Sequence, residues 1–293
     1  MTITYEFKAN ALTYLAFGNK KGKVSLYYYG SGTNAMFTFT QYAIQPKYIV
    51  ALLYNNGSIV SYAIGEVVSL LCSNSIQVSF IDTSTASYTA NEIIIYTANG
   101  NPDSLSSLTL LSTVSYFNNV NLSKSSSEVV KINWSLNITT QGTDFSSIIA
   151  YIILQLVIPT ENVNSTLSSQ CNSLITNNQY STVSYAGIPS LSVEYILGGE
   201  SSTHSESVTP TSVQVYANAL VINFSITTPN EQGNPYTLQG IVVNSNFIIT
   251  TYVGDTLEST QSSQLLPLAS LSLSQPLPLN VTIPAKVIIQ IGE

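Results

Sequence analysis

The stretch Lys131-Ile132-Asn133-Trp134-Ser135-Leu136-Asn137-Ile138-Thr139 carries the pattern that decides the fold of this chain. Apolar and polar residues alternate along it, and alternate side chains of an extended strand lie on opposite faces. One face therefore carries isoleucine, tryptophan and leucine, and the other carries asparagine, serine and threonine. This alternation predicts a strand that buries one face and exposes the other.

The same alternation recurs on both sides of this stretch and predicts a chain made almost entirely of strands. The predicted strands are 2–8, 12–17, 23–29, 36–43, 48–54, 59–64, 67–71, 76–81, 92–97, 108–117, 129–139, 147–158, 181–185, 191–197, 213–227, 236–251 and 281–291.

Breaks in the alternation predict turns, loops and one helix. Asn55-Asn56-Gly57 is typical of a tight hairpin turn, because Asn and Gly tolerate positive φ angles, and residues 99–103 indicate another turn. Apolar residues at helical spacing after Pro159 predict a helix over 161–176. We expect loops at 198–212, 229–235 and 255–264, and an edge or connecting segment at the proline-rich 266–284.

Short strands at regular spacing predict an all-β protein with at most one short helix. We expect two tandem antiparallel β-sandwich domains of the jelly-roll or immunoglobulin-like type. The polar segment 118–128 is the predicted boundary, so the domains are 1–122 and 123–293, the second of which contains the helix near 161–176. With 44% hydrophobic residues the chain can bury a core, which argues against disorder.

The charge balance argues against nucleic acid as a partner. The chain has no arginine, eight lysines and 15 acidic residues, which gives a net charge of −7. Nucleic-acid binders need clustered basic residues, and the one cluster here, Lys20, Lys21 and Lys23, is typical of a solvated turn. The longest apolar stretch, 148–158, contains Gln155 and is too short for a membrane span.

The sequence contains no pattern that predicts catalysis, a cofactor or a metal site. A triad would need His204, the single histidine, which lies in a polar, loop-like stretch without a nucleophile elbow. Carboxylates could hydrolyse glycosides if two met in space, but spacing pairs none of the candidates, which are Glu66, Asp82, Glu92, Glu128, Asp144, Glu194 and Asp255. We therefore expect a protein that is not an enzyme. Its 19 tyrosines fit sheet packing, with a sugar platform as the alternative.

The two cysteines leave two interpretations open. Cys72 and Cys171 could form one disulfide that closes a long loop, or they could be separate buried thiols. Neither lies in a metal-binding pattern.

Asn-X-Ser/Thr sequons recur along the chain and mark candidate sites of N-glycosylation. On strands such as 131–139 the asparagines share the polar face, which we expect to be exposed. The seven sequon asparagines are Asn56, Asn121, Asn133, Asn137, Asn164, Asn223 and Asn280.

The low charge predicts an acid-tolerant exterior protein, because few carboxylates lose favourable interactions when they are protonated. In composition and strand pattern the chain resembles structural proteins of viruses of hot, acidic archaeal hosts, and also the extracellular filament and surface proteins of those hosts. The first resemblance implies a capsid, turret or vertex component at the virion surface, which self-assembles with copies of itself and other structural subunits and meets a host glycan or receptor.

The alternatives are a cellular extracellular filament or adhesion subunit and a carbohydrate-binding or carbohydrate-active β protein. Residues 1–8 lack the features of a signal peptide, which favours the virion interpretation. Strand exchange in a filament would predict that residues 2–8 pair with another subunit.

Overall fold

The structure is a computed structural model that describes residues 2–17, 22–27, 34–39, 46–71, 74–139, 144–145, 150, 153–154, 156–161, 179–184, 191–199, 202–229, 235–253 and 256–292. Strands dominate these residues, and their pairing is antiparallel throughout. The mostly β character is thus confirmed, whereas the arrangement as two tandem sandwiches stays a prediction.

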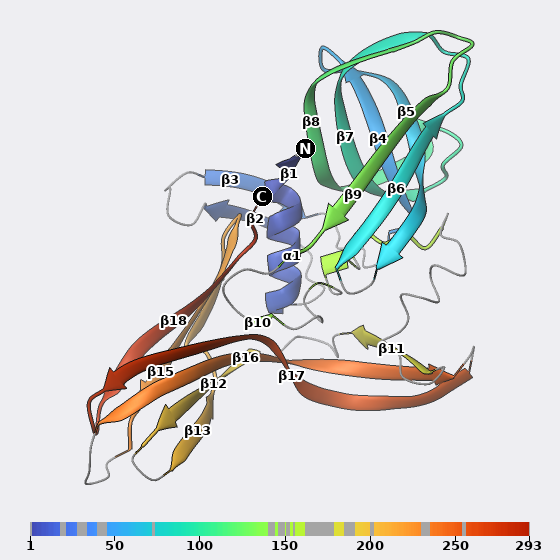
Figure 1. Cartoon of the computed structure of the whole chain (residues 1–293). Coiled ribbons are helices and arrows are strands. Elements are labelled where there is room, and N and C mark those ends of the chain that lie inside the picture. The colour runs from blue at the N-terminus through green and yellow to red at the C-terminus, as the bar shows by residue number, and fades with distance from the viewer. Residues whose placement is uncertain are drawn as a thin grey trace.

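The N-terminal part forms a seven-stranded sheet that curls into a half-barrel (Figure 1). Its strands follow the order β1-β8-β7-β4-β5-β6-β9. Their bounds are β1 Thr2–Ile3, β4 Tyr48–Asn55, β5 Ser58–Leu71, β6 Ser75–Asp82, β7 Tyr88–Gly100, β8 Leu108–Lys124 and β9 Val130–Asn137, with a short 3-10 helix at Leu105–Ser107.

The C-terminal part contains a six-stranded and a three-stranded sheet. The six-stranded sheet comprises β10 Asp144–Phe145, β11 Gln179–Ser184, β12 Leu191–Gly198, β13 Thr203–Val208, β16 Tyr236–Val253 and β17 Thr256–Leu277. The three-stranded sheet comprises β14 Ser212–Val215, β15 Ala219–Thr227 and β18 Thr282–Gln290. A separate hairpin pairs β2 Gly22–Tyr27 with β3 Asn34–Phe39.

One helix, α1 (Tyr5–Phe17), lies between the two parts of the molecule (Figure 1). It contacts β8 of the half-barrel and β14 and β15 of the three-stranded sheet. Every residue from Phe7 to Ala16 is buried. One hydrophobic cluster consequently runs from the half-barrel through α1 into the C-terminal sheets.

The strands predicted at 2–8 and 12–17 are wrong, because this segment forms β1 and α1. A helix buried on every side has no polar face, so the helical period is missing from its sequence. Thr4 caps the helix: its Oγ1 accepts a hydrogen bond from the Phe7 N–H at 3.1 Å. Since Thr2 and Ile3 pair with β8 of the same chain, strand exchange through residues 2–8 loses its structural basis.

Other predicted segments also differ from the structure. The strand expected at 147–158 is helical at Ala150, Ile153 and Leu154, and its mostly apolar sequence has no diagnostic period. The expected loops at 198–212 and 255–264 contain β13 and the start of β17, because the hydrogen bonds of neighbouring strands hold these polar residues in the sheet. The strand expected at 213–227 is divided into β14 and β15.

The polar segment 118–128 begins inside strand β8, and the division of the chain into the units 1–122 and 123–293 stays a prediction. Strand β8 runs to Lys124 and pairs with β7 up to that residue, so residue 122 lies inside a paired strand. Strand β9 then adds to β6, and the first sheet extends to Asn137. A polar sequence here reflects exposed strand rather than a linker.

The hairpin turn at residues 55–58 is confirmed. Asn56 and Gly57 adopt φ angles of 50° and 80°, as the predicted turn requires. Asn55 pairs with Ser58 across it. The turn at 99–103 is also present, and the helix predicted at 161–176 lies outside the described residues except for Glu161.

Most of the stretch 131–139 belongs to β9. The face predicted to be buried and the face predicted to be exposed are both confirmed. Trp134 and Leu136 are buried, and Ile132 and Ile138 are half-buried. The Trp134 Nε1–H donates to Ser115 Oγ on β8 at 2.9 Å, so this bond joins β9 to β8, near the two ends of the strand order of the curled sheet. Trp134 therefore fills the interior of the half-barrel and helps to maintain its curvature.

We expect Trp134→Phe to lower the free energy of unfolding by about 2–4 kcal/mol, because a buried ring shrinks and Ser115 loses its donor. The change in the midpoint of urea unfolding, followed by circular dichroism, measures this. The control Asn137→Gln changes an exposed residue of the same strand and should shift stability by less than about 0.5 kcal/mol. Equal effects of the two variants would contradict this role.

Candidate functional surfaces and polar clusters

The sequon asparagines lie mainly on the surface. Asn56, Asn121, Asn133, Asn137 and Asn280 are exposed. Asn223 is half-buried, and its Nδ2 donates to Ser212 Oγ at 2.9 Å. Asn164 lies outside the described residues, as do Cys72 and Cys171. The exposed asparagines could carry sugar without disturbing the sheets, and their occupancy stays a prediction.

A buried polar cluster gathers around Asp82 at the end of β6. Asp82 is 5% exposed. Its carboxylate accepts hydrogen bonds from Ser61 Oγ at 2.6 Å, Tyr88 Oη at 2.8 Å and the Ser84 N–H at 2.8 Å. Burial alone would raise the pKa of Asp82, but these hydrogen bonds outweigh it and lower the pKa from 3.8 to about 2.

Lys124, at the end of β8, completes this cluster. It is 3% exposed, and its Nζ donates to the carbonyl oxygens of Ser84, Ala86 and Ser125. The same Nζ lies 5.9 Å from the centre of the Tyr88 ring. Asp82 and Lys124 together hold the connection between β6 and β7 against the end of the half-barrel.

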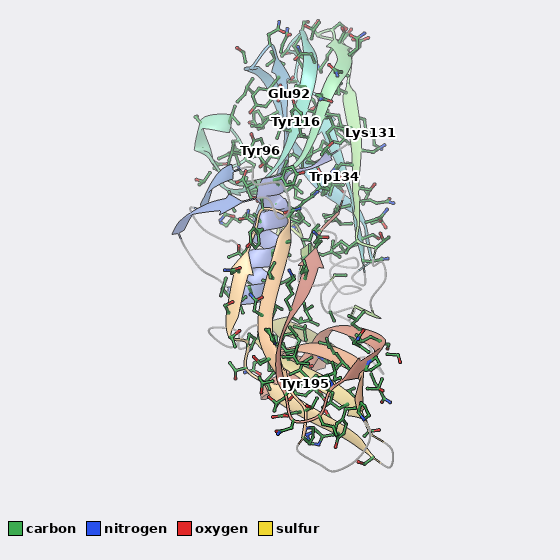
Figure 2. All side chains as sticks on the ribbon, turned by 90° about the vertical axis from the view of Figure 1, so that its left-hand side faces the viewer. Glu92, Tyr96, Tyr116, Lys131, Trp134 and Tyr195 are labelled. Atoms are coloured by element: carbon green, nitrogen blue, oxygen red, sulfur yellow. The ribbon has the colours of Figure 1, made fainter. Side chains whose placement is uncertain are left out.

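A second cluster ties the two C-terminal sheets together through Tyr195 on β12. The Tyr195 side chain is fully buried, and its hydroxyl donates to Glu206 Oε2 at 2.5 Å. The Tyr195 hydroxyl oxygen also accepts a hydrogen bond from the N–H of Thr227, at the end of β15, at 3.1 Å. Burial and the hydrogen bond to Glu206 raise the pKa of Tyr195. Figure 2 shows Tyr195 in the lower part of the molecule and Trp134 in the upper half.

His204 lies on β13 rather than in a loop. Its Nε2 is 4.0 Å from Glu206 Oε2, and the two side chains are 49% and 45% exposed. Neither a serine nor a cysteine hydrogen-bonds to His204 in the part of the chain that the structure describes. The residues around His204 therefore do not form a nucleophilic triad.

Three of the candidate carboxylates, at Asp82, Glu128 and Glu194, each have a hydrogen-bond partner that is not an acid. Asp82 bonds to neutral donors, Glu128 accepts from the Ser125 N–H at 2.6 Å, and Glu194 accepts from Ser205 Oγ. Asp255 and the side chain of Asp144 lie outside the described part. Among the described residues, no three His, Cys, Asp or Glu side chains gather as a metal site would, and no helix is long and apolar enough to cross a membrane.

Tyrosines cover a small second core on the outer face of the half-barrel. Val50, Leu52 and Ala98 are buried there beneath half-buried tyrosines, which are Tyr48, Tyr54, Tyr62 and Tyr96. Tyr62 Oη donates to the Pro102 carbonyl oxygen at 3.1 Å. Tyr96, Tyr116 and Glu92 can be followed on the half-barrel in Figure 2. These four tyrosines therefore pack on the sheet, as expected, and a sugar platform stays a prediction.

Sequence reasoning missed Lys124 and Tyr195. Tyr195 lies on the apolar face of the predicted strand 191–197, so alternation indicates its burial but not its partners. Lys124 lies in the polar segment 118–128, where nothing in the sequence indicates burial. The hydrogen bonds of Lys124 to Ser84 and of Thr227 to Tyr195 join segments that are distant in the sequence. Only the folded structure therefore reveals the roles of Lys124 and Tyr195.

The described residues define a mostly β protein with antiparallel sheets, one of which is a half-barrel. No family model matches the chain, and no solved structure matches it. The chain is 29% identical over 294 residues to the uncharacterized protein ORF246 of Acidianus filamentous virus 2 (isolate Italy/Pozzuoli), a match that covers 100% of this chain and 98% of the relative. This similarity indicates a viral origin and assigns no role.

The pKa of Asp82 predicts how stability depends on pH. A carboxylate whose folded pKa is lowered stabilises the fold above its unfolded pKa, and this contribution is lost as pH falls toward the folded value. We expect Asp82→Asn to lower the free energy of unfolding by about 2 kcal/mol at pH 7 and to have little effect at pH 2. Urea unfolding across this range measures the difference, and Asp103→Asn in the exposed turn is the control. A cost that is the same at both pH values would refute this role.

Tyr195→Phe tests the tie between the C-terminal sheets. Removing the hydroxyl leaves the Thr227 N–H without this acceptor and should cost about 1–3 kcal/mol. The matched control is Tyr216→Phe, whose hydroxyl donates to the exposed Gln214 at 3.3 Å. The midpoints of urea unfolding compare the two, and a larger loss in the control would contradict the assignment.

Proposed function

We propose that this protein is a virion structural protein, a capsid-associated or surface turret or spike component that self-assembles and has no catalytic activity. Its place is the virion surface, and its partners are copies of itself, other structural subunits and a glycan or receptor on the host. The finer architecture proposed is two sandwich-like units, with α1 packed between the half-barrel and the C-terminal sheets.

The observation that carries the proposal is the similarity to a viral protein along the whole chain. It extends over both the half-barrel and the C-terminal sheets, so it concerns the complete fold rather than one shared module. The interior agrees with a structural role, since its buried polar groups hold loops and sheets together. Asp82, Lys124 and Tyr195 all serve the fold in this way.

The low charge of the chain supports the proposal that the protein is exposed to an acidic exterior. Only 8% of residues are charged, so little repulsion develops when acid protonates the carboxylates. Asp82 keeps its hydrogen-bonded charge down to a pH of about 2. Exposed sequon asparagines on β8, β9 and the hairpin at residues 55–58 offer sites for N-linked sugar, which would add a neutral, hydrated layer.

A cellular filament or adhesion subunit is the alternative function. It shares the neutral surface and the exposed sequons. It differs in its location, since such a subunit would occur on uninfected cells. The location of the protein, on virions or on uninfected cells, therefore distinguishes the two proposals.

Mass spectrometry of purified virions is the test. We expect this chain to be a stoichiometric component of washed particles and to be digested by protease on intact virions. Intact-mass measurement should show N-linked sugar on at least two of the exposed sequons. Immunogold labelling should place the chain on the particle surface.

A matched control is the same preparation from uninfected cells, which should lack the protein. Absence from washed particles would overturn the virion proposal, and presence on uninfected cell surfaces would support the filament alternative. An intact mass equal to that of the polypeptide would overturn the proposed glycosylation and leave the virion proposal unaffected.

A further inference from the structure

Unpaired sheet edges are candidate contact surfaces, because their backbone N–H and C=O groups can pair with another strand. The edge strands whose side chains the structure describes are β1, β9, β13, β14 and β18. Strands β1 and β14 have only two and four residues, and β18 contains Pro284, which removes a donor. The remaining edges, β9 with eight residues and β13 with six, contain no proline.

Strands β9 and β13 lie at opposite ends of the molecule (Figure 1). Strand β9 closes the order of the half-barrel sheet, and β13 closes the order of the six-stranded sheet. Two different patches at opposite ends can join copies head to tail, and a repeated contact of this kind builds a chain of subunits.

The charges on the two edges are complementary. Lys131 is exposed on β9 and projects from the half-barrel in Figure 2. Glu206 on β13 is 45% exposed. Since the chain has a net charge of −7, copies repel one another overall, and a lysine opposite a glutamate would offset this locally and select the orientation.

One antiparallel register gives the charged, apolar and amide side chains of the β9 edge a suitable neighbour on β13. If Lys131 lies opposite Glu206, Val129 lies opposite Val208 and Asn133 lies opposite His204. Val129 is 61% exposed, the largest exposed fraction among the large apolar side chains described, and Val208 is half-buried. The register therefore covers an exposed valine, pairs opposite charges and sets an amide beside an imidazole.

We propose that β9 of one copy pairs with β13 of the next, so that the protein assembles head to tail through two sheet edges that no other described strand covers. This contact rests on the proposed structural function and specifies the partner as a second copy of this chain. A glycan on Asn133 would fill the space opposite His204, so the pairing requires Asn133 to be free of sugar in the assembly.

Charge reversal tests the contact with purified protein, without sugar, at neutral pH and low salt. Sedimentation velocity and electron microscopy should show chains of subunits for the wild type. Lys131→Glu and Glu206→Lys should each weaken association at least about tenfold, because each sets like charges opposite one another. The control Lys286→Glu alters an exposed lysine on the proline-containing β18 and should leave association unchanged.

An equimolar mixture of the two single variants provides the decisive result. In an alternating assembly every contact again joins a basic and an acidic side chain, so association should return to near the wild-type level. The double variant K131E/E206K should assemble alone for the same reason. A contact between two β9 edges would instead be insensitive to Glu206→Lys.

Three further variants distinguish loss of the contact from loss of folding. Glu206→Gln keeps an acceptor for Tyr195 and should weaken association less than Glu206→Lys, while circular dichroism verifies that each variant is folded. Val129→Asp should weaken association, whereas Val68→Asp, at a side chain that is 50% exposed on β5, should not.

A wild type that stays monomeric, a mixture that fails to recover, or single variants that assemble normally would each overturn the edge contact. None of these results bears on whether the protein is present in virions. Its absence from particles would overturn the function, whatever the purified protein does.

Discussion

The burial of α1 on every side is the constraint on which the rest of the structure depends. The helix contacts β8 of the half-barrel and β14 and β15 of the three-stranded sheet, so both parts lose core surface if it is displaced. Thr4 secures its start, since its Oγ1 accepts from the Phe7 N–H and donates to the Thr113 carbonyl oxygen at 2.7 Å. One side chain thus caps the helix and attaches it to β8.

Polar groups inside this protein maintain its architecture. Tyr195 connects two sheets, Lys124 holds the carbonyl oxygens of a connection, and Asp82 gathers three donors around one carboxylate. Asp82 and Lys124 pair with neutral groups, and Tyr195 pairs with the Glu206 carboxylate and the Thr227 backbone. A buried group that loses such a partner costs more than the bond contributes. Asp82 and Lys124 are thus two buried charged side chains that each organise several backbone segments.

The surface shows the opposite arrangement, with neutral hydrogen-bonding groups and scattered charges. Exposed asparagines occupy the outer face of β9, and the same strand presents an open backbone edge. Sugar and strand pairing compete at Asn133, whereas Asn56 on the hairpin is free of this restriction. An assembly built through sheet edges would thus constrain which sequons can carry sugar.

The sequence by itself determined the strands whose two faces differ. The alternation at 131–139 places Trp134 inside and Asn133 outside, and Asn56-Gly57 specifies its turn, because both signals are local. Only the tertiary structure decided that residues 5–17 are helical, that 118–124 continue a strand, and that 203–208 form an edge. In each case the deciding contacts come from distant segments. A helix buried on all sides has no polar face to reveal its period, and a polar strand is held by the hydrogen bonds of its neighbours rather than by its own pattern.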